Sequence, residues 1–254
     1  MATLGVVIFS ADGMKHIAEC VESVAWADEI LIVHAGPAAV ELRETGGSPA
    51  RLKTVGSLAE AASVCGELET EWILRLWGEE RVEPELKDDL QALRRGALQD
   101  GDSIYRVPIR SYLLGGWAEG SVSGLSPVPR LYRKGETPAA GWWAETRVAR
   151  VLPRGWIGDY ACSELSRAVD HLQLLSDFWA RRLSVVGSPP GSIKVVLSSL
   201  RVFLGMLFAN GIFSRGLAGI GLSALAGYTV LLSGAKCWEA RHVRAPGNAP
   251  KQAP

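Results

Sequence analysis

The first 33 residues contain two short apolar runs on either side of a segment with helical spacing. Residues 4–9 (LGVVIF) are an unbroken run rich in β-branched side chains, and residues 29–33 (EILIV) are a second one. Between them, residues 14–25 place apolar side chains at helical intervals, with Ser10 or Asp12 suited to cap that helix. A strand, a helix and a strand of these lengths are typical of a sheet with parallel strands, so the sequence predicts an α/β fold.

The segments that follow extend this pattern. Short apolar runs predict further strands, and amphipathic stretches that begin after turn residues predict helices. A Gly- and Ser-rich segment over residues 115–126 is expected to be a loop. The predicted strands are residues 53–55, 72–76, 103–109 and 129–133, and the predicted helices are residues 58–69 and 84–98.

The charge of the chain changes sign near residue 170. The 254 residues include 27 basic and 27 acidic ones, but residues 1–170 carry 18 and 25 of them, whereas residues 171–254 carry 9 and 2. A net charge of zero excludes a general nucleic-acid polycation, and basic residues do not alternate with aromatic ones in a nucleic-acid-binding pattern. An acidic part followed by a basic, apolar part is typical of a soluble domain joined to a region near a membrane or an acidic partner.

The basic part contains two apolar segments after an amphipathic helix predicted over residues 171–185. Residues 193–213 are strongly apolar, and residues 216–235 carry no charge. The second segment has about the length that crosses a hydrocarbon core of roughly 30 Å as a helix. Small residues recur every fourth position from Gly219 to Gly227, which suits close helix packing. The segment is therefore either in contact with a membrane (re-entrant, interfacial or spanning) or a glycine-rich helix buried on the soluble domain.

These observations predict three regions: an α/β domain over residues 1–165, a helical region over residues 166–243 and a disordered tail over residues 244–254. The N-terminus lacks a basic segment and a cleavage site, so no signal peptide is expected. The four cysteines and four histidines lack the spacing of a structural zinc site, and a reducing, cytoplasmic environment is expected. The sequence contains no dinucleotide-binding, P-loop, nucleophile-elbow or zinc-protease motif.

Three segments carry more specific motifs: LGVVIFSADG (residues 4–13), CVESVAWADEILIVHAG (residues 20–36) and EWILRLWGEERVEPEL (residues 71–86). They resemble the front of family 2 glycosyltransferases, in particular the subgroup that builds lipopolysaccharide core and related cell-envelope glycans. The resemblance extends to about Glu239. It implies a nucleotide-diphosphosugar-transferase-like (GT-A type) mixed sheet flanked by helices, followed by a C-terminal helical, membrane-associating region. It also implies Mg²⁺ or Mn²⁺ as cofactor.

The resemblance assigns candidate site residues, and the chain differs from the family at several of them. The family ends its second strand in an Asp that helps to seat the nucleotide, and His34 occupies that position here. The family's Asp-x-Asp turn holds the cation that bridges the donor diphosphate, and here the turn is Trp77-Gly78-Glu79. The family's His-Glu pair before Arg-Val corresponds to Glu145 and Thr146.

Each candidate has a functional and a structural interpretation. Glu79 either ligates the cation or is a solvated turn carboxylate. Glu145 is either the base that takes a proton from the acceptor hydroxyl or a loop carboxylate. His34 either contacts the nucleotide or ends a strand with its hydrogen bonds satisfied, and Asp12 either contacts a base or caps a helix. The predicted nucleotide-binding residues are Ser10, Asp12, His34 and Trp77.

Aromatic and arginine side chains supply further candidates. Trp117, Trp142 and Trp143 form either a sugar-stacking platform or ordinary core and membrane-interface aromatics. Arg130 and Arg133 either meet phosphates or lie on a solvated strand edge.

Two functional hypotheses follow. In the first, a membrane-associated glycosyltransferase moves a sugar from a nucleotide-sugar donor, UDP-type by preference, to an envelope glycan or lipid-linked acceptor. A donor of another kind, such as a lipid-phosphate sugar, is a variant that needs no diphosphate-binding cation. In the second, a catalytically inactive pseudo-glycosyltransferase binds or scaffolds protein partners of a polysaccharide pathway. Both place the chain at the cytoplasmic face of the bacterial inner membrane, peripheral or partly inserted through residues 193–235, with no nucleic-acid partner.

Overall fold

The computed structural model divides into two units. Unit 1 comprises residues 1–121 and 125–161, and unit 2 comprises residues 122–124 and 162–254. The residues that the structure describes are 1–11, 16–35, 50–55, 64–96, 103–113, 115–119, 129–136, 150–152, 154–185, 191–209 and 212–242.

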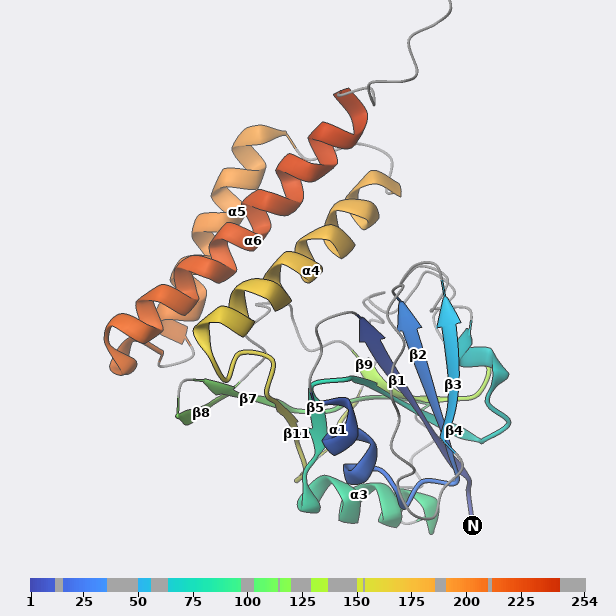
Figure 1. Ribbon diagram of the computed structural model, residues 1–254. Coiled ribbons are helices and arrows are strands. Elements are labelled where there is room, and N and C mark those ends of the chain that lie inside the picture. The colour runs from blue at the N-terminus through green and yellow to red at the C-terminus, as the bar shows by residue number, and fades with distance from the viewer. Residues whose placement is uncertain are drawn as a thin grey trace, which may run out of the picture. The chain divides into compact units, whose positions relative to one another are not determined.

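The main sheet of unit 1 has seven strands in the order β10-β6-β9-β4-β1-β2-β3. Figure 1 labels β9, β4, β1, β2 and β3 of this sheet. The four strands β3, β2, β1 and β4 run parallel, and β9 is antiparallel to both β4 and β6. Unit 1 is therefore a mixed α/β domain, as the sequence predicts. The strands of this sheet are β1 (Leu4–Ala11), β2 (Glu29–Ala35), β3 (Ala50–Val55), β4 (Trp72–Trp77), β6 (Ile104–Arg106), β9 (Pro129–Arg133) and β10 (Arg150–Val151).

A second, four-stranded sheet in the order β5-β11-β7-β8 belongs to the same unit. The predicted loop over residues 115–126 is wrong in part, because it contains β8 after Gly115, whose φ is 91°. The predicted strand over residues 103–109 is two strands, since Pro108 has no N–H to continue a ladder. The strands of this sheet are β5 (Glu80–Val82), β7 (Ile109–Leu113), β8 (Gly116–Glu119) and β11 (Ile157–Asp159).

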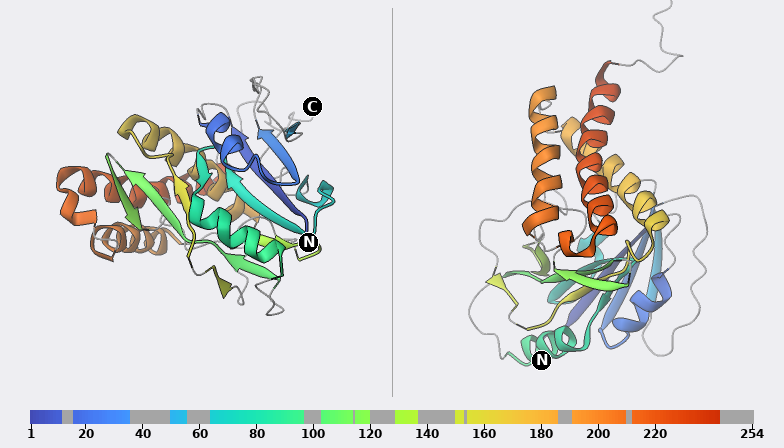
Figure 2. Two further views of the ribbon diagram at one scale, coloured as in Figure 1. Left: turned by 90° about the horizontal axis from the view of Figure 1, so that it is seen from below. Right: turned by 90° about the vertical axis from the view of Figure 1, so that its left-hand side faces the viewer.

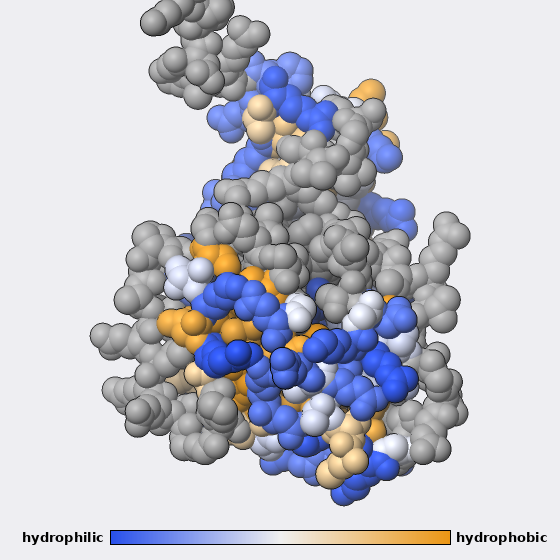
Figure 3. All heavy atoms as spheres, turned by 90° about the vertical axis from the view of Figure 1, so that its right-hand side faces the viewer, coloured by the Kyte–Doolittle hydropathy of each residue, from blue (hydrophilic) through white to orange (hydrophobic). Residues whose placement is uncertain are grey.

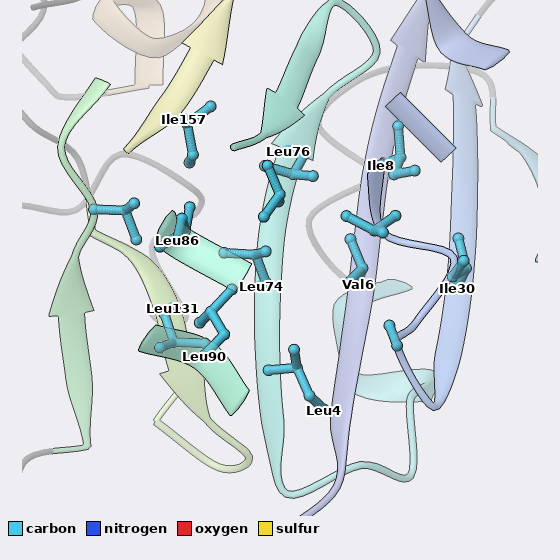
Figure 4. Packing of buried hydrophobic residues seen from close by; sticks show 14 of the residues in the cluster. Leu4, Val6, Ile8, Ile30, Leu74, Leu76, Leu86, Leu90, Leu131 and Ile157 are labelled. Atoms are coloured by element: carbon cyan, nitrogen blue, oxygen red, sulfur yellow. The ribbon is translucent and has the colours of Figure 1, made fainter. Parts of the chain in front are cut away.

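Two hydrophobic clusters lie on opposite faces of the parallel strands. Side chains alternate along β1, so Leu4, Val6 and Ile8 enter the first cluster, whereas Val7 and Phe9 enter the second. The helices α1 (Ile17–Ser23) and α3 (Pro84–Arg94) contribute to the first cluster, and Figure 4 shows Leu86 and Leu90 of α3 pointing toward Leu74 and Leu76 of β4. The short 3₁₀ helix η1 (Cys65–Glu67) is followed by Leu68, a member of the second cluster.

The helix α3 is shorter than its predicted range of residues 84–98. Pro84 occupies a first-turn position, where its missing N–H costs nothing. The helix ends at Arg94, and Gly96 has a φ of 80°, the left-handed conformation that commonly terminates helices. Of the helix predicted over residues 58–69, residues 58–63 lie outside the described residues.

The edge strand β3 carries charged side chains. Arg51 is paired with Glu29, and Lys53 is paired with Glu67. Charged residues on an edge strand discourage pairing with another chain. The view toward this side of the molecule shows hydrophilic residues over much of the coloured surface (Figure 3).

Unit 2 is helical, and its central helix lies between two others (Figures 1 and 2). The predicted apolar segment 193–213 is not one helix, because a π-helical turn and a 3₁₀ turn follow the α-helix. Within the described residues, Gly219–His242 is the one helical segment long and apolar enough to cross a membrane. The elements are α4 (Leu165–Val185), α5 (Ser192–Leu204), η2 (Gly205–Ala209), η3 (Ile212–Arg215) and α6 (Leu217–His242).

Candidate functional site

The candidate site lies where the carboxyl ends of β1, β2 and β4 meet. From β1 the chain passes to β2 and β3 on one side and then to β4 on the other, so the direction of winding reverses between β1 and β4. In open sheets of parallel strands, ligands bind outside the carboxyl ends at such a reversal. The turn Gly78-Glu79 follows β4 directly, and the N–H of Gly78 donates to the carbonyl of Phe9 on β1 (2.8 Å).

Ser10 and His34 are paired positions on β1 and β2. Their side chains follow Ile8 and Ile32 in the alternation and therefore lie on the face of the first cluster. The Oγ of Ser10 is 3.0 Å from Nδ1 of His34, and both residues are buried. This hydrogen bond gives His34 a partner on the neighbouring strand, and a nucleotide contact for either residue stays a prediction.

Trp77 lies on the opposite face of the sheet. Its ring packs against the second cluster, with its centroid 6.3 Å from that of Phe9 at an interplanar angle of 59°. The predicted nucleotide-binding residues are thus divided between two faces: Ser10 and His34 share one, and Trp77 occupies the other. Asp12, the remaining member of the set, lies outside the described residues.

The turn after β4 holds two buried carboxylates. Glu79 is 6% exposed and Glu80 is 3% exposed, so neither is a solvated turn residue. One carboxylate oxygen of Glu80 accepts the backbone N–H of Trp77 (2.8 Å), and the other lies 2.6 Å from a guanidinium nitrogen of Arg130. The backbone carbonyl of Glu79 accepts the N–H of Tyr160 (3.1 Å).

Asp159 adds a third acid to this group. It lies opposite Glu80 in the register of β5 and β11, and its carboxylate accepts hydrogen bonds from the Ser111 hydroxyl (3.0 Å) and the Ala161 N–H (3.0 Å). Burial raises the pKa of Glu80 to about 7, Arg130 opposes this shift, and the negative charge of Asp159 adds to it.

The sequence gives little sign of this arrangement. Arg130 lies 50 positions from Glu80 along the chain, and no spacing rule connects them. The other candidate arginine, Arg133, lies opposite Trp72 at the amino end of β4 and pairs with Glu71 (2.8 Å). Arg130 is therefore at the candidate site, and Arg133 is not.

The described residues do not fit a preformed cation site. No group of three or more His, Cys, Asp or Glu side chains among them is placed to hold a metal ion. The carboxylate of Glu80 is already engaged by Arg130 and by the Trp77 N–H. Mg²⁺ and Mn²⁺ prefer carboxylate oxygens that are free to bind them, so we derive no step through a cation. Glu145, the predicted base, lies outside the described residues.

An aromatic group lies on the second sheet. Trp117 is 39% exposed and contacts Tyr112, Trp156 and Tyr160 edge to face, at centroid distances of 4.7–5.4 Å. The guanidinium of Arg81 lies 4.2 Å from the ring centroid of Tyr160. The predicted platform partners Trp142 and Trp143 lie outside the described residues.

No protein-family model matches this sequence, and no curated protein matches it. Among solved structures, the chain is similar to S. aureus TarS, with 12% identity over 85% of this chain and 46% of that one and a TM-score of 0.40. HddC from Yersinia pseudotuberculosis gives 9% identity over 63% of this chain and 93% of that one, with a TM-score of 0.42. A putative glucose-1-phosphate thymidylyltransferase from Bacillus anthracis, in complex with a sucrose, gives 8% identity, 68% and 76% coverage and a TM-score of 0.32. The chain spans less than half of TarS, and at these scores the likenesses do not decide its family.

Proposed function

We propose that this chain is a glycosyltransferase-like protein of cell-envelope polysaccharide or lipopolysaccharide biosynthesis, with its nucleotide-sugar donor at the edge between β1 and β4. The observation that carries the proposal is the reversal of winding at this edge, where Ser10, His34 and the Glu79 turn end adjacent parallel strands. The motifs shared with family 2 glycosyltransferases support the same assignment.

The proposed reaction is a single displacement. An acceptor hydroxyl oxygen attacks the anomeric carbon of the donor sugar, and the bond from that carbon to the nucleoside diphosphate breaks. The hydroxyl proton passes to a carboxylate base, for which Glu145 is the candidate. The donor is of the UDP type, and the acceptor is an envelope glycan or a lipid-linked glycan.

A second function, a catalytically inactive scaffold that holds protein partners of a polysaccharide pathway, is favoured by a specific observation. The Glu80 carboxylate forms an ion pair with Arg130 and accepts a hydrogen bond from the Trp77 N–H within the protein. A cation that used Glu80 as a ligand would have to compete with both partners. Loss of a cation site would leave the fold intact while removing the chemistry of transfer.

Calorimetric titration of the full-length protein with UDP, and then with other nucleoside diphosphates, with and without Mn²⁺, separates these functions. Binding that requires Mn²⁺ and is lost in Glu79→Gln, but kept in the exposed control Glu85→Gln, would support transfer with Glu79 as a ligand. Binding without Mn²⁺ would support transfer in which the protein's own groups hold the diphosphate. A folded protein that binds no nucleoside diphosphate would contradict donor binding and favour the scaffold.

A further inference from the structure

The central helix of unit 2, α6, packs against α4 on one side and against α5 on the other. On the α4 side, Nζ of Lys236 lies 2.8 Å from the Ser176 hydroxyl and 2.5 Å from a carboxylate oxygen of Asp177. On the α5 side, the Ser199 hydroxyl donates to the Gly227 carbonyl (2.7 Å). The helix that is long enough to cross a membrane is thus the central helix of its unit, flanked by α4 and α5.

Two glycines of α6 determine which face of α5 is turned inward. A Cβ at Gly234 would lie 2.6 Å from a methyl group of Val195, and a Cβ at Gly227 would lie 3.1 Å from the Ser199 carbonyl oxygen. Because no side chain intervenes at these positions, α5 approaches α6 closely through Val195 and Ser199. The residues on the side of α5 opposite Val195 and Ser199 must therefore face away from α6.

The outward face of α5 is apolar. Its large side chains recur at helical spacing and are between 41% and 78% exposed. At the end of the helix, Phe208 stacks on Phe213 (centroids 6.2 Å apart), and Phe213 and Leu217 continue the exposed apolar surface. The outward apolar side chains of α5 and η2 are Ile193, Val196, Leu197, Leu200, Leu204 and Phe208.

The charge around this face is positive. Lys194 and Arg201 are exposed on α5, and Arg201 lines a surface groove together with Leu197 and Leu204. No acidic residue occurs between Asp177 and Glu239 in the sequence. By contrast, α4 exposes Asp170 and Asp177. Of the two helices beside α6, α5 is thus the one that combines an exposed apolar face with basic residues and no acidic ones.

We propose that the outward face of α5 docks on the surface of a membrane that contains anionic phospholipid. The helix lies in the plane of the interface, with Leu197 and Leu200 at the boundary of the acyl chains and Lys194 and Arg201 at the lipid phosphates. A spanning α6 would carry Arg201 of α5, two residues from the Ser199 that donates to Gly227 in the middle of α6, into hydrocarbon, which is costly, so α6 remains outside the bilayer. This docking would hold the protein at the cytoplasmic face of the bacterial inner membrane and is independent of the proposed sugar transfer.

Flotation of the full-length protein with vesicles tests the proposal. We expect it to bind vesicles of equal parts phosphatidylcholine and phosphatidylglycerol, and to bind pure phosphatidylcholine vesicles at least about tenfold more weakly. The double variant L197E/L200E should lose about tenfold or more in binding. The matched control V169E/Q173E, which also introduces two glutamates but at exposed positions of α4, should bind within about twofold of the wild type. Circular dichroism and thermal unfolding establish that each variant is folded.

Other outcomes would overturn the proposal. Equal binding to both kinds of vesicle would show that lipid charge does not contribute to binding. Unchanged binding of Arg201→Glu to the anionic vesicles would show the same for the basic side chain. A folded wild-type protein that does not float with either vesicle would exclude a lipid surface as the occupant. A dimer in sedimentation velocity that L197E/L200E dissociates would show that a second copy covers the face. Resistance of the bound protein to extraction at alkaline pH would indicate a spanning α6 instead of in-plane docking.

Discussion

A guanidinium nitrogen of Arg130 on β9 lies 2.6 Å from a carboxylate oxygen of Glu80, the first residue of β5. The other oxygen of Glu80 binds the N–H of Trp77 at the end of β4. One buried side chain thus connects the turn after β4 to an antiparallel strand contributed from 50 residues further along the chain. The turn at the candidate site is fixed by an internal ion pair.

Replacing Glu80 by Gln should change how stability depends on pH. The pKa of Glu80 is raised from its ordinary value of 4.5 to about 7, mainly by burial. Between these values the folded state binds more protons than the unfolded state, so this carboxyl group lowers the free energy of unfolding as pH rises through the window. Glu80→Gln lacks this titrating group. Its free energy of unfolding relative to that of the wild type should therefore increase from about pH 5 to about pH 8, by up to about 3 kcal/mol.

Urea unfolding at a series of pH values, followed by tryptophan fluorescence, measures this difference. Glu85→Gln, on the exposed surface of α3, is the control and should run parallel to the wild type. Parallel curves for Glu80→Gln and the wild type would contradict the raised pKa.

The strands of the parallel sheet could be predicted because their apolar residues are contiguous. β1, β2 and β4 are buried on both faces, so their sequences are nearly unbroken apolar runs. β8 was not predictable in this way, since it is short and lies in a glycine-rich segment whose pairing with β7 is a tertiary feature. The same limit applies to unit 2, where composition identifies apolar helices but not which face of α5 stays exposed.

The strand-end placement of the candidate site residues was predictable from the sequence, but the contacts of their side chains were not. The motifs place Ser10, His34 and Glu79 at strand ends, where the structure also has them. Whether Trp77 lies on the same face of the sheet as His34 depends on where each strand ends, because a shift of one residue moves a side chain to the other face. The burial of Glu80 depends on Arg130, and pairs so distant in sequence leave no periodic signal.

Ser10→Ala should destabilise the protein through His34. The variant removes the hydroxyl that lies 3.0 Å from Nδ1 of the buried imidazole, so we expect a loss of about 1–2 kcal/mol in the free energy of unfolding. A double-mutant cycle with His34→Leu measures the coupling, which should be about 1 kcal/mol. Additive effects of the two substitutions would show that the hydrogen bond contributes nothing.

Gly155→Ala should be strongly destabilising because α3 lies against this residue. A Cβ there would fall 2.1 Å from Cα of Leu86, and the Gly155 N–H donates to Asp89 (3.0 Å) on the same helix. The backbone would have to move, at an expected cost of about 3 kcal/mol in the free energy of unfolding. Gly66→Ala is the matched control, since nothing lies within 4 Å of its Cβ, and it should change stability by less than about 0.5 kcal/mol. Equal effects of the two substitutions would refute the close packing of α3.

Trp77→Ala distinguishes a packing role of the indole from one in the nucleotide site. The ring is half-buried against Phe9 on the face opposite Ser10 and His34, so its loss should lower the free energy of unfolding by about 2 kcal/mol. If the wild type binds UDP, the affinity of the variant for UDP should stay within about twofold of it. If the wild type does not bind UDP, the variant should not bind it either. In both cases the reason is that the ring does not occupy the Ser10–His34 side of the edge. Trp77→Phe, which keeps an aromatic ring against Phe9, should recover most of the stability. A gain of tenfold or more in UDP affinity in the alanine variant, measured by calorimetry on folded protein, would instead mean that the indole fills space needed by the donor.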